Sequence, residues 1–118
     1  LVCKHTYYFL KEAVIMGSND FGNYLRSLIK QAGMTQTQFY IALGITKPYF
    51  YDILSGKVSP PPPELQFKCL NILDVDEKTS AQFLDLAAKA RGEIPADVAN
   101  WMKAHPEVIS NIRNCMSK

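Results

Sequence analysis

The stretch Met34–Lys57, MTQTQFYIALGITKPYFYDILSGK, has the pattern of two short helices joined by a tight glycine turn. The first helix has a strong start signal, because Thr35 and Gln38 fit a capping box of the Ser/Thr-x-x-Glu/Gln kind. We expect Gly44 to end it, since a chain that reverses within three residues needs a left-handed backbone, which glycine adopts without Cβ strain. The rest of the chain is interpreted as support for this helix pair.

The second helix of the pair is expected to begin after Thr46, with Pro48 in its first turn, where the missing N–H costs nothing. Its apolar positions, Phe50, Ile53 and Leu54, fall on one side and predict a core face. The opposite side carries Lys47, Pro48, Tyr51, Asp52 and Ser55. A mixed face of this kind fits a helix that reads a DNA groove, and it fits plain solvent surface equally well.

Apolar periodicity predicts helices on both sides of the pair as well. One is expected to begin after Ser18-Asn19-Asp20, a cluster of good cap residues, and to end at Gly33. Four prolines at 60–63 then interrupt the helical pattern. Further helices are expected from Pro63 onward, from Glu77 to about Ala90, after Pro95 and after Pro106. Because no strand pattern and no internal repeat is found, the predicted fold class is all-α.

Each expected helix has an apolar side that predicts its contribution to the core. Before the pair, these residues are Phe21, Tyr24, Leu25, Leu28 and Ile29, and in its first helix they are Phe39, Ala42 and Leu43. After the pair, they are Leu65, Cys69, Leu70 and Leu73, followed by Phe83, Leu84, Leu86, Ala87 and Ala90.

The composition is that of an ordinary globular protein, since 47% of the 118 residues are hydrophobic and 20% are charged. No apolar run approaches the roughly 18 residues that a membrane span needs, so we expect no membrane partner. Three cysteines, Cys3, Cys69 and Cys115, lie far apart, which suits the reducing cytoplasm and gives neither a disulfide framework nor a zinc cluster. His5 and His105 are interpreted as solvent or capping residues, and no metal or other cofactor is expected.

The formal net charge of +2 is small, but the charges are unevenly distributed. Between residues 16 and 61 they are Arg26, Lys30, Lys47 and Lys57 against Asp20 and Asp52. Between residues 62 and 92 the balance reverses, with Glu64, Asp74, Asp76, Glu77 and Asp85 against Lys68, Lys78, Lys89 and Arg91. Positive charge gathered beside the helix pair is what a DNA-binding protein with one binding face would show. Arg26 and Lys30, one turn apart, are interpreted either as a solvated face or as contacts to a DNA backbone.

Taken together, these residues resemble the helix-turn-helix of the lambda-repressor-like (XRE, Cro/repressor) family. The family pattern is Leu-Thr-Gln, then Leu-Ala, then Leu-Gly-Val/Ile-Ser, an apolar position in the recognition helix, and Gly-Lys followed by Pro. The chain matches it in unbroken register with Met34-Thr35-Gln36, Phe39-Tyr40, Leu43-Gly44-Ile45-Thr46, Phe50, Ile53, Gly56-Lys57 and Pro60. The resemblance covers residues 20 to about 75, roughly half of the chain.

The resemblance implies a lambda-repressor-like bundle of four to five helices with a C-terminal helical extension. Residues 1–15 are expected to form a loosely ordered or helical N-terminal extension, and residues 16–75 the helix-turn-helix DNA-binding domain. Residues 76–118 are expected to form the C-terminal extension, which either completes the core or dimerises. Its apolar side chains are Val98, Trp101, Met102, Val108, Ile109 and Ile112.

By position in the family motif, two sets of residues are implied to contact double-stranded DNA. Base contacts in the major groove are implied for Lys47, Pro48, Tyr51 and Asp52. Phosphate contacts are implied for Gln36, Thr46, Tyr49, Ser55 and Lys57. The chemistry of the first set is uneven, because Lys47 can donate to guanine, Pro48 can only pack on a thymine methyl, and Asp52 can only accept from cytosine N4. Tyr40 departs from the family's small residue, and we expect its ring to lean outward or to widen the helix crossing.

The function that the resemblance implies is a sequence-specific DNA-binding transcriptional regulator, a repressor, which reads the major groove with residues 47–55 as a homodimer in the cytoplasm. The alternative is an antitoxin or other interaction module with the same fold, which binds a protein partner through residues 76–118. RNA binding is left open, although no aromatic stacking motif of an RNA-binding module is present. An enzyme is not expected, because no nucleophile–base pair, carboxylate couple, phosphate loop or metal spacing is found.

Overall fold

The computed structural model describes residues 19–117, and the regular structure in this part of the chain is entirely helical. Its helices are α2 (Asp20–Gln31), α3 (Gln36–Leu43), α4 (Lys47–Ser55), α5 (Pro63–Leu73), α6 (Glu77–Arg91), α7 (Ala96–Ala104) and α8 (Pro106–Met116). The predicted all-α helix-turn-helix bundle is therefore confirmed. The predicted N-terminal extension, residues 1–15, lies outside the described residues.

Local capping defines the helix pair α3–α4, as the sequence predicted. The Thr35 hydroxyl accepts a hydrogen bond from the Gln38 backbone N–H at 3.0 Å, and the Gln38 side chain accepts one from the Thr35 N–H at 2.9 Å. Gly44 ends α3 with a left-handed φ of 84°. The Thr46 hydroxyl then caps α4 by accepting from the Tyr49 N–H at 3.3 Å. These bonds satisfy backbone groups that a helix terminus otherwise leaves unpaired.

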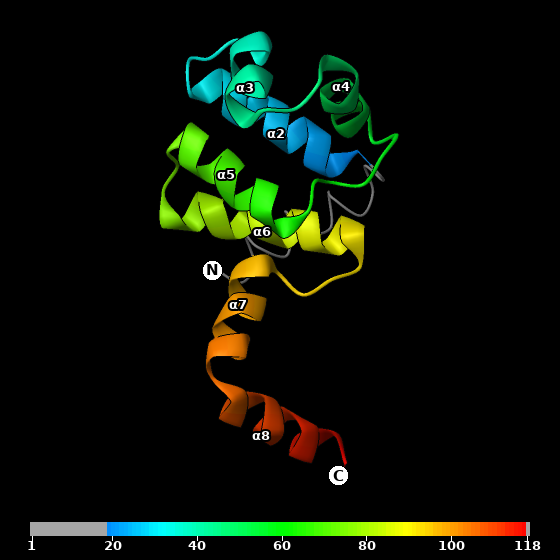
Figure 1. The fold of residues 1–118 in the computed structure, drawn as a ribbon, viewed down its shortest axis with the longest axis vertical. Coiled ribbons are helices and arrows are strands. Elements are labelled where there is room, and N and C mark those ends of the chain that lie inside the picture. The colour runs from blue at the N-terminus through cyan, green and yellow to red at the C-terminus, as the bar shows by residue number, and fades with distance from the viewer. Residues whose placement is uncertain (1–18, 118) are drawn as a thin grey trace, which may run out of the picture.

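The helices α2 to α6 enclose one hydrophobic core (Figure 1). Phe39, Phe50 and Phe83 are fully buried, and the ring of Phe21 packs on Phe83 at a centroid distance of 5.0 Å. This contact joins the first described helix to α6, so α6 packs in the same core as the helix pair. The remaining core residues are Leu25, Leu28, Ile29, Leu43, Ile53, Leu54, Cys69, Leu73, Leu84, Leu86, Ala87 and Ala96.

Helix α3 buries Phe39 and Leu43 as predicted, but the flanks of this core face differ from the prediction. Ala42 was expected on its inner face but is exposed, and Tyr40, expected to lean outward, is half-buried against the core. The cause is α4, because the Tyr40 ring packs on Phe50 at a centroid distance of 5.4 Å. The tyrosine side of α3 is therefore the covered one. Of the two outcomes expected for Tyr40, leaning outward was wrong, and a widened helix crossing stays a prediction.

Helix α6 shows a similar difference near its C-terminal end. Ala90 was predicted to be buried but is exposed, whereas Ala88 is buried with 4% of its surface accessible. The reason is that α6 is covered on several sides at once, by α2, α5 and α7. The prediction assumed that α6 buries one apolar side only, which does not hold for a helix in contact with three others.

The two terminal helices extend from the bundle rather than folding over it (Figure 1), which gives the molecule principal extents of 50 × 30 × 27 Å. Helix α7 buries only Ala96, and α8 buries none of its residues. Trp101 remains 53% exposed. In the described chain, these helices therefore leave their apolar side chains outside the core. No helix within residues 19–117 is long and apolar enough to cross a membrane.

Candidate nucleic-acid interface

The helix pair α3–α4 lies at one end of the molecule, and α7–α8 lie at the other (Figure 1). Helix α4 has two distinct faces, because Phe50, Ile53 and Leu54 are buried while the residues between them reach solvent. Of the predicted contact residues, Thr46, Lys47, Pro48, Tyr51, Ser55 and Lys57 are exposed, and Gln36, Tyr49 and Asp52 are half-buried. The structure thus brings the predicted residues to the same end of the bundle.

The position of α4 depends on a close approach to α2 at Gly22. A Cβ atom built on Gly22 would lie 2.2 Å from the Leu54 carbonyl oxygen and 2.7 Å from its carbonyl carbon. Both contacts are far shorter than van der Waals distance, so only glycine allows the two backbones to approach this closely. The absence of a side chain at Gly22 therefore sets the short distance between the backbones of α2 and α4.

The residues predicted to face bases differ in their freedom to move. Lys47 and Pro48 are exposed in the first turn of α4. Tyr51 is 41% exposed, and its ring meets Phe50 edge-on at a centroid distance of 5.3 Å, so the core supports one edge of this side chain. Asp52 is half-buried, and its backbone carbonyl accepts from the Lys57 N–H at 3.0 Å. The N-terminal half of α4 is therefore its more accessible part.

The hydroxyl groups of Thr46 and Ser55, predicted to contact phosphates, already take part in capping or intrahelical bonds. The Thr46 hydroxyl accepts from the Tyr49 N–H, which leaves its own hydrogen free to be donated. The Ser55 hydroxyl, in contrast, donates to the Asp52 carbonyl at 3.2 Å. Ser55 must break this bond before its hydroxyl can donate to a phosphate. The Thr46 hydroxyl can donate without breaking its capping bond.

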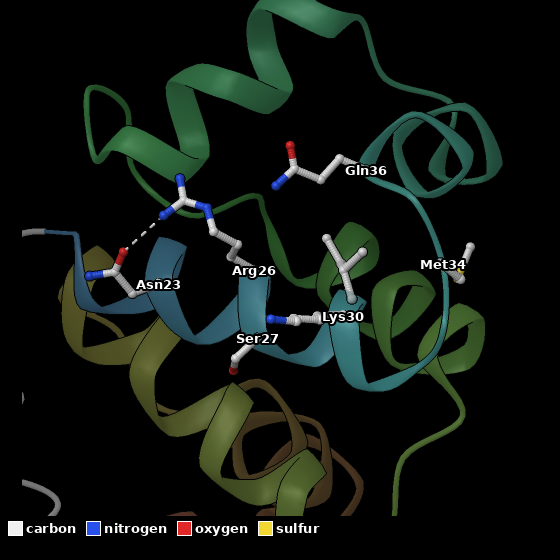
Figure 2. A pocket seen from close by; sticks show the side chains of 7 residues that line it. Asn23, Arg26, Ser27, Lys30, Met34 and Gln36 are labelled. Atoms are coloured by element: carbon white, nitrogen blue, oxygen red, sulfur yellow. Dashed lines mark hydrogen bonds between the residues drawn. The ribbon is translucent and has the colours of Figure 1, made fainter.

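A shallow hollow of about 510 Å³ lies beside the N-terminal end of α3 (Figure 2). Arg26 extends toward it from α2 and Gln36 from the first position of α3. A hydrogen bond of 3.2 Å from Arg26 Nη1 to Asn23 Oδ1 orients the guanidinium group. The hollow is lined by Asn23, Arg26, Ser27, Ile29, Lys30, Met34 and Gln36.

This hollow has the donors that an anion requires. Arg26 and Lys30 supply positive charge, Gln36 supplies an amide, and the N-terminus of α3, where Gln36 lies, adds the positive end of a helix dipole. From the sequence alone, Arg26 and Lys30 are interpreted either as a solvated face or as contacts to a DNA backbone. Their one-turn spacing was the available signal, but only the fold places them beside Gln36.

Groups that could hold a metal ion are not assembled in the described part of the chain. Within residues 19–117, no three His, Cys, Asp or Glu side chains are grouped to hold a metal ion. Cys69 is buried, and burial raises the pKa of its thiol to about 12, so the thiol stays protonated at neutral pH. The chemistry that the α3–α4 surface offers is hydrogen bonding, charge and apolar contact.

Comparison with known proteins supports the same assignment. A family model described as a helix-turn-helix domain matches residues 20–83, which is more than half of the chain. No curated protein and no solved structure gives a significant match. The matched residues run from the start of α2 into α6 and include both helices of the pair. The chain therefore belongs to the helix-turn-helix domain family, in agreement with its resemblance to lambda-repressor-like proteins.

Proposed function

We propose that the protein is a sequence-specific DNA-binding transcriptional regulator, a repressor, which reads the major groove with α4. The observation that carries the proposal is the division of α4 into two faces. Its core face is fully buried, whereas Lys47, Pro48 and Tyr51 are exposed at the same end of the bundle as the hollow that holds Arg26 and Gln36. Insertion into a DNA groove requires a helix whose core face is fixed by packing and whose opposite face is polar and accessible.

The roles of the side chains follow from their donors and acceptors. Lys47 donates to the O6 and N7 acceptors of guanine, and Pro48 packs against a thymine methyl. Tyr51 and Asp52 complete the base-facing set, and Asp52 favours cytosine because a carboxylate can only accept. Phosphate contacts come from Gln36, Thr46, Tyr49, Ser55 and Lys57, and we add Arg26 on the basis of the hollow.

The small positive charge limits how tightly one chain can bind. With four to six phosphate contacts, the slope of log K against log salt concentration is about −4 to −5, from roughly −0.9 per contact. Few exposed cations beside the helix pair can make such phosphate contacts, mainly Arg26, Lys30, Lys47 and Lys57. We therefore propose that the active form is a homodimer that binds two DNA half-sites. Such a regulator works without a cofactor and without enzymatic activity, in the compartment that holds the DNA, which agrees with the cytoplasmic location that the cysteines predict.

A second candidate function is favoured by the exposed apolar side chains of α7 and α8. An antitoxin or another interaction module would use residues 76–118 to bind a protein partner while the helix pair binds DNA. Purification from the native host separates the two cases. A regulator that acts alone is recovered as a single species, whereas an antitoxin brings a second protein in a fixed ratio.

DNA binding is tested by replacing Gln36 and Lys47 separately with alanine and measuring affinity across a series of salt concentrations. The DNA ligand is first selected from a random pool with the wild-type protein. Gln36→Ala is expected to weaken binding to all sequences alike, and Lys47→Ala to weaken it and also relax the base preference at one position. Lys78→Ala, an exposed cation on α6 away from both the helix pair and the terminal helices, is the matched control and leaves the affinity unchanged. If neither Gln36→Ala nor Lys47→Ala alters binding, α4 does not read the groove.

A further inference from the structure

The terminal helices and the segment before them expose an unusual amount of apolar surface. Ile94 is 54% exposed, Val98 44%, Trp101 53%, Ile112 44% and Met116 78%. We refer to residues 94–116 as the C-terminal arm. Exposed apolar side chains that gather on one segment of a protein commonly mark a surface that binds a partner. The arm therefore needs a partner surface.

The apolar pattern of the arm is symmetric about His105. Each large apolar side chain before His105 has a large apolar counterpart at the same distance after it. The eight Val, Ile, Met and Trp side chains of the arm form four such pairs, which are Ile94 and Met116, Val98 and Ile112, Trp101 and Ile109, and Met102 and Val108. When two copies of the arm lie antiparallel with their His105 residues side by side, the two members of each pair come from different chains and face each other. Every large apolar side chain of one arm therefore meets a large apolar side chain of the other.

The charged residues of the arm also lie in pairs at equal distances from His105, and the two members of each pair have opposite charges. Asp97 and Arg113 lie at equal distances from His105, and so do Lys103 and Glu107. All four side chains are exposed, and the arm contains no other Asp, Glu, Lys or Arg. In an antiparallel pair of arms, each acidic residue therefore meets a basic residue of the other copy, and no like charges meet. Complementary charges of this kind fix the register of an interface.

We propose that two copies of the chain pair through their C-terminal arms, antiparallel and with the two-fold axis at His105. Helix α7 of each copy then lies along α8 of the other, and the same patch serves both chains, as an isologous dimer requires. The proposal deepens the regulator function above, on which the role of the dimer in DNA binding rests. A different protein partner has no need of a surface that is complementary to itself.

The centre of the arm is built as a fixed bend. Pro106 begins α8 directly after His105, so the two helices cannot merge into one. The His105 ring stacks on Trp101 at a centroid distance of 4.1 Å, and its Nδ1 lies 2.8 Å from the Trp101 carbonyl oxygen. These contacts order the end of α7, and the Val108 N–H donates to the His105 carbonyl at 2.9 Å, so the junction is ordered before any partner arrives and less entropy is lost on pairing.

The charge pairing is tested by reversal and rescue in the full-length protein. The dissociation constant of the dimer is measured by sedimentation equilibrium for Asp97→Arg, Arg113→Asp and the double variant. Each single reversal places two like-charged pairs in the dimer and is expected to raise the constant about tenfold, whereas the double variant returns to within about threefold of wild type. Failure of the double variant to recover overturns the proposed register. Both sites are exposed, and far-UV circular dichroism checks that each variant is folded.

The register is tested independently by cross-linking. In a chain with Cys3→Ser and Cys115→Ser, one sample carries Val98→Cys and another Ile112→Cys. A short bismaleimide is expected to link the mixture and neither sample alone, because only positions 98 and 112 face each other across the axis. Asn100→Cys mixed with Ile112→Cys is the matched control, since residue 100 is exposed but lies off the apolar stripe. Cys69 is buried and does not compete. Equal linking in all samples overturns the proposal.

The sole tryptophan of the chain, Trp101, lies in the arm, so dilution provides a third readout. Its emission is expected to shift to longer wavelength as the dimer dissociates, over the same concentration range in which sedimentation shows the mass to halve. A chain that stays monomeric at every concentration overturns the pairing and leaves DNA binding to a single half-site intact. A chain that pairs as described but binds no DNA overturns the proposed function and leaves the pairing intact.

Discussion

Gly22 provides the sharpest test of how α4 is held in place. The substitution Gly22→Ala adds one methyl group at a buried position in α2, facing the backbone of α4. The added Cβ atom would lie 2.2 Å from the Leu54 carbonyl oxygen, where ordinary contact begins at 3.4 Å. The neighbouring atoms belong to the backbone and cannot rotate away. The two helices therefore have to separate by about 1 Å, from the difference between these distances.

The expected loss of stability combines two opposing effects. Overpacking of a tight contact costs about 1–3 kcal/mol, and a backbone clash of this size belongs at the upper end. Alanine recovers about 1 kcal/mol, because glycine is a poor helix former. The net loss is therefore about 2 kcal/mol, from the difference of these two effects. For a domain of roughly 100 residues, this lowers Tm by roughly 8–15 °C.

Thermal and urea unfolding followed by far-UV circular dichroism measure this loss. Ser27→Ala in the same helix is the matched control, because Ser27 is exposed and its replacement changes stability by less than about 0.5 kcal/mol. Displacement of α4 is also expected to lower DNA affinity at least about tenfold by misplacing its side chains. If Gly22→Ala unfolds at the wild-type temperature or above it, α2 and α4 do not approach as closely as described, and the reasoning fails.

Three further predictions concern single side chains. Gln66→Leu leaves the buried Pro61 carbonyl without the 2.8 Å bond from the Gln66 side chain, and urea unfolding is expected to show a loss of about 1–3 kcal/mol. Hydrogen bonds from Thr79 hold the pKa of Asp76 below its usual 3.8, so the stability that its ionised form contributes is present above that pH and is lost as the pH falls through the lower folded value. Asp76→Asn keeps a capping side chain but removes this acid-sensitive contribution, which is read from unfolding midpoints in acid and at neutral pH. Arg26→Ala is expected to weaken binding to all DNA sequences and to reduce the salt slope by about 1, as measured by titrations at several salt concentrations.

The helix pair was predictable from the sequence because its signals are local. The capping box of Thr35 and Gln38 lies within one turn, and the left-handed Gly44 depends only on its own backbone. The burial of Phe50, Ile53 and Leu54 likewise follows from helical spacing. Since these features need no information from distant parts of the chain, pattern and propensity were sufficient.

The errors arose where contacts between distant residues decide the outcome. Tyr40 and Ala42 lie on opposite flanks of the α3 core face, and only the position of Phe50 in α4 selects the tyrosine side. The approach of Gly22 to Leu54 joins helices that are far apart in the chain. No pattern within either helix indicates that their backbones touch.

The candidate site was predictable to a similar extent. The exposure of Lys47 and Pro48 follows from the core face behind them, which helical periodicity located. The hollow beside α3 did not follow, because it depends on how α2 crosses the start of α3 and brings Arg26 toward Gln36. Neither did the bond from Ser55 to the Asp52 carbonyl, since a serine in the last turn of a helix has several acceptors within reach.

The separation of the two DNA half-sites depends on how far α4 lies from the C-terminal arm. Each chain is 50 Å long, with α4 near one end and the arm at the other (Figure 1). Two chains that overlap only along arms of roughly 30 Å, from the helix rise per residue, form a dimer roughly 70 Å long, so their α4 helices lie at most about this far apart. A separation of this order corresponds to about two turns of DNA, whereas many dimeric helix-turn-helix proteins bind half-sites a single turn of roughly 34 Å apart. Paired half-sites at increasing separations, tested by gel shift, are therefore expected to bind best near two turns. An optimum at one turn would mean that the chains pair through another surface closer to α4.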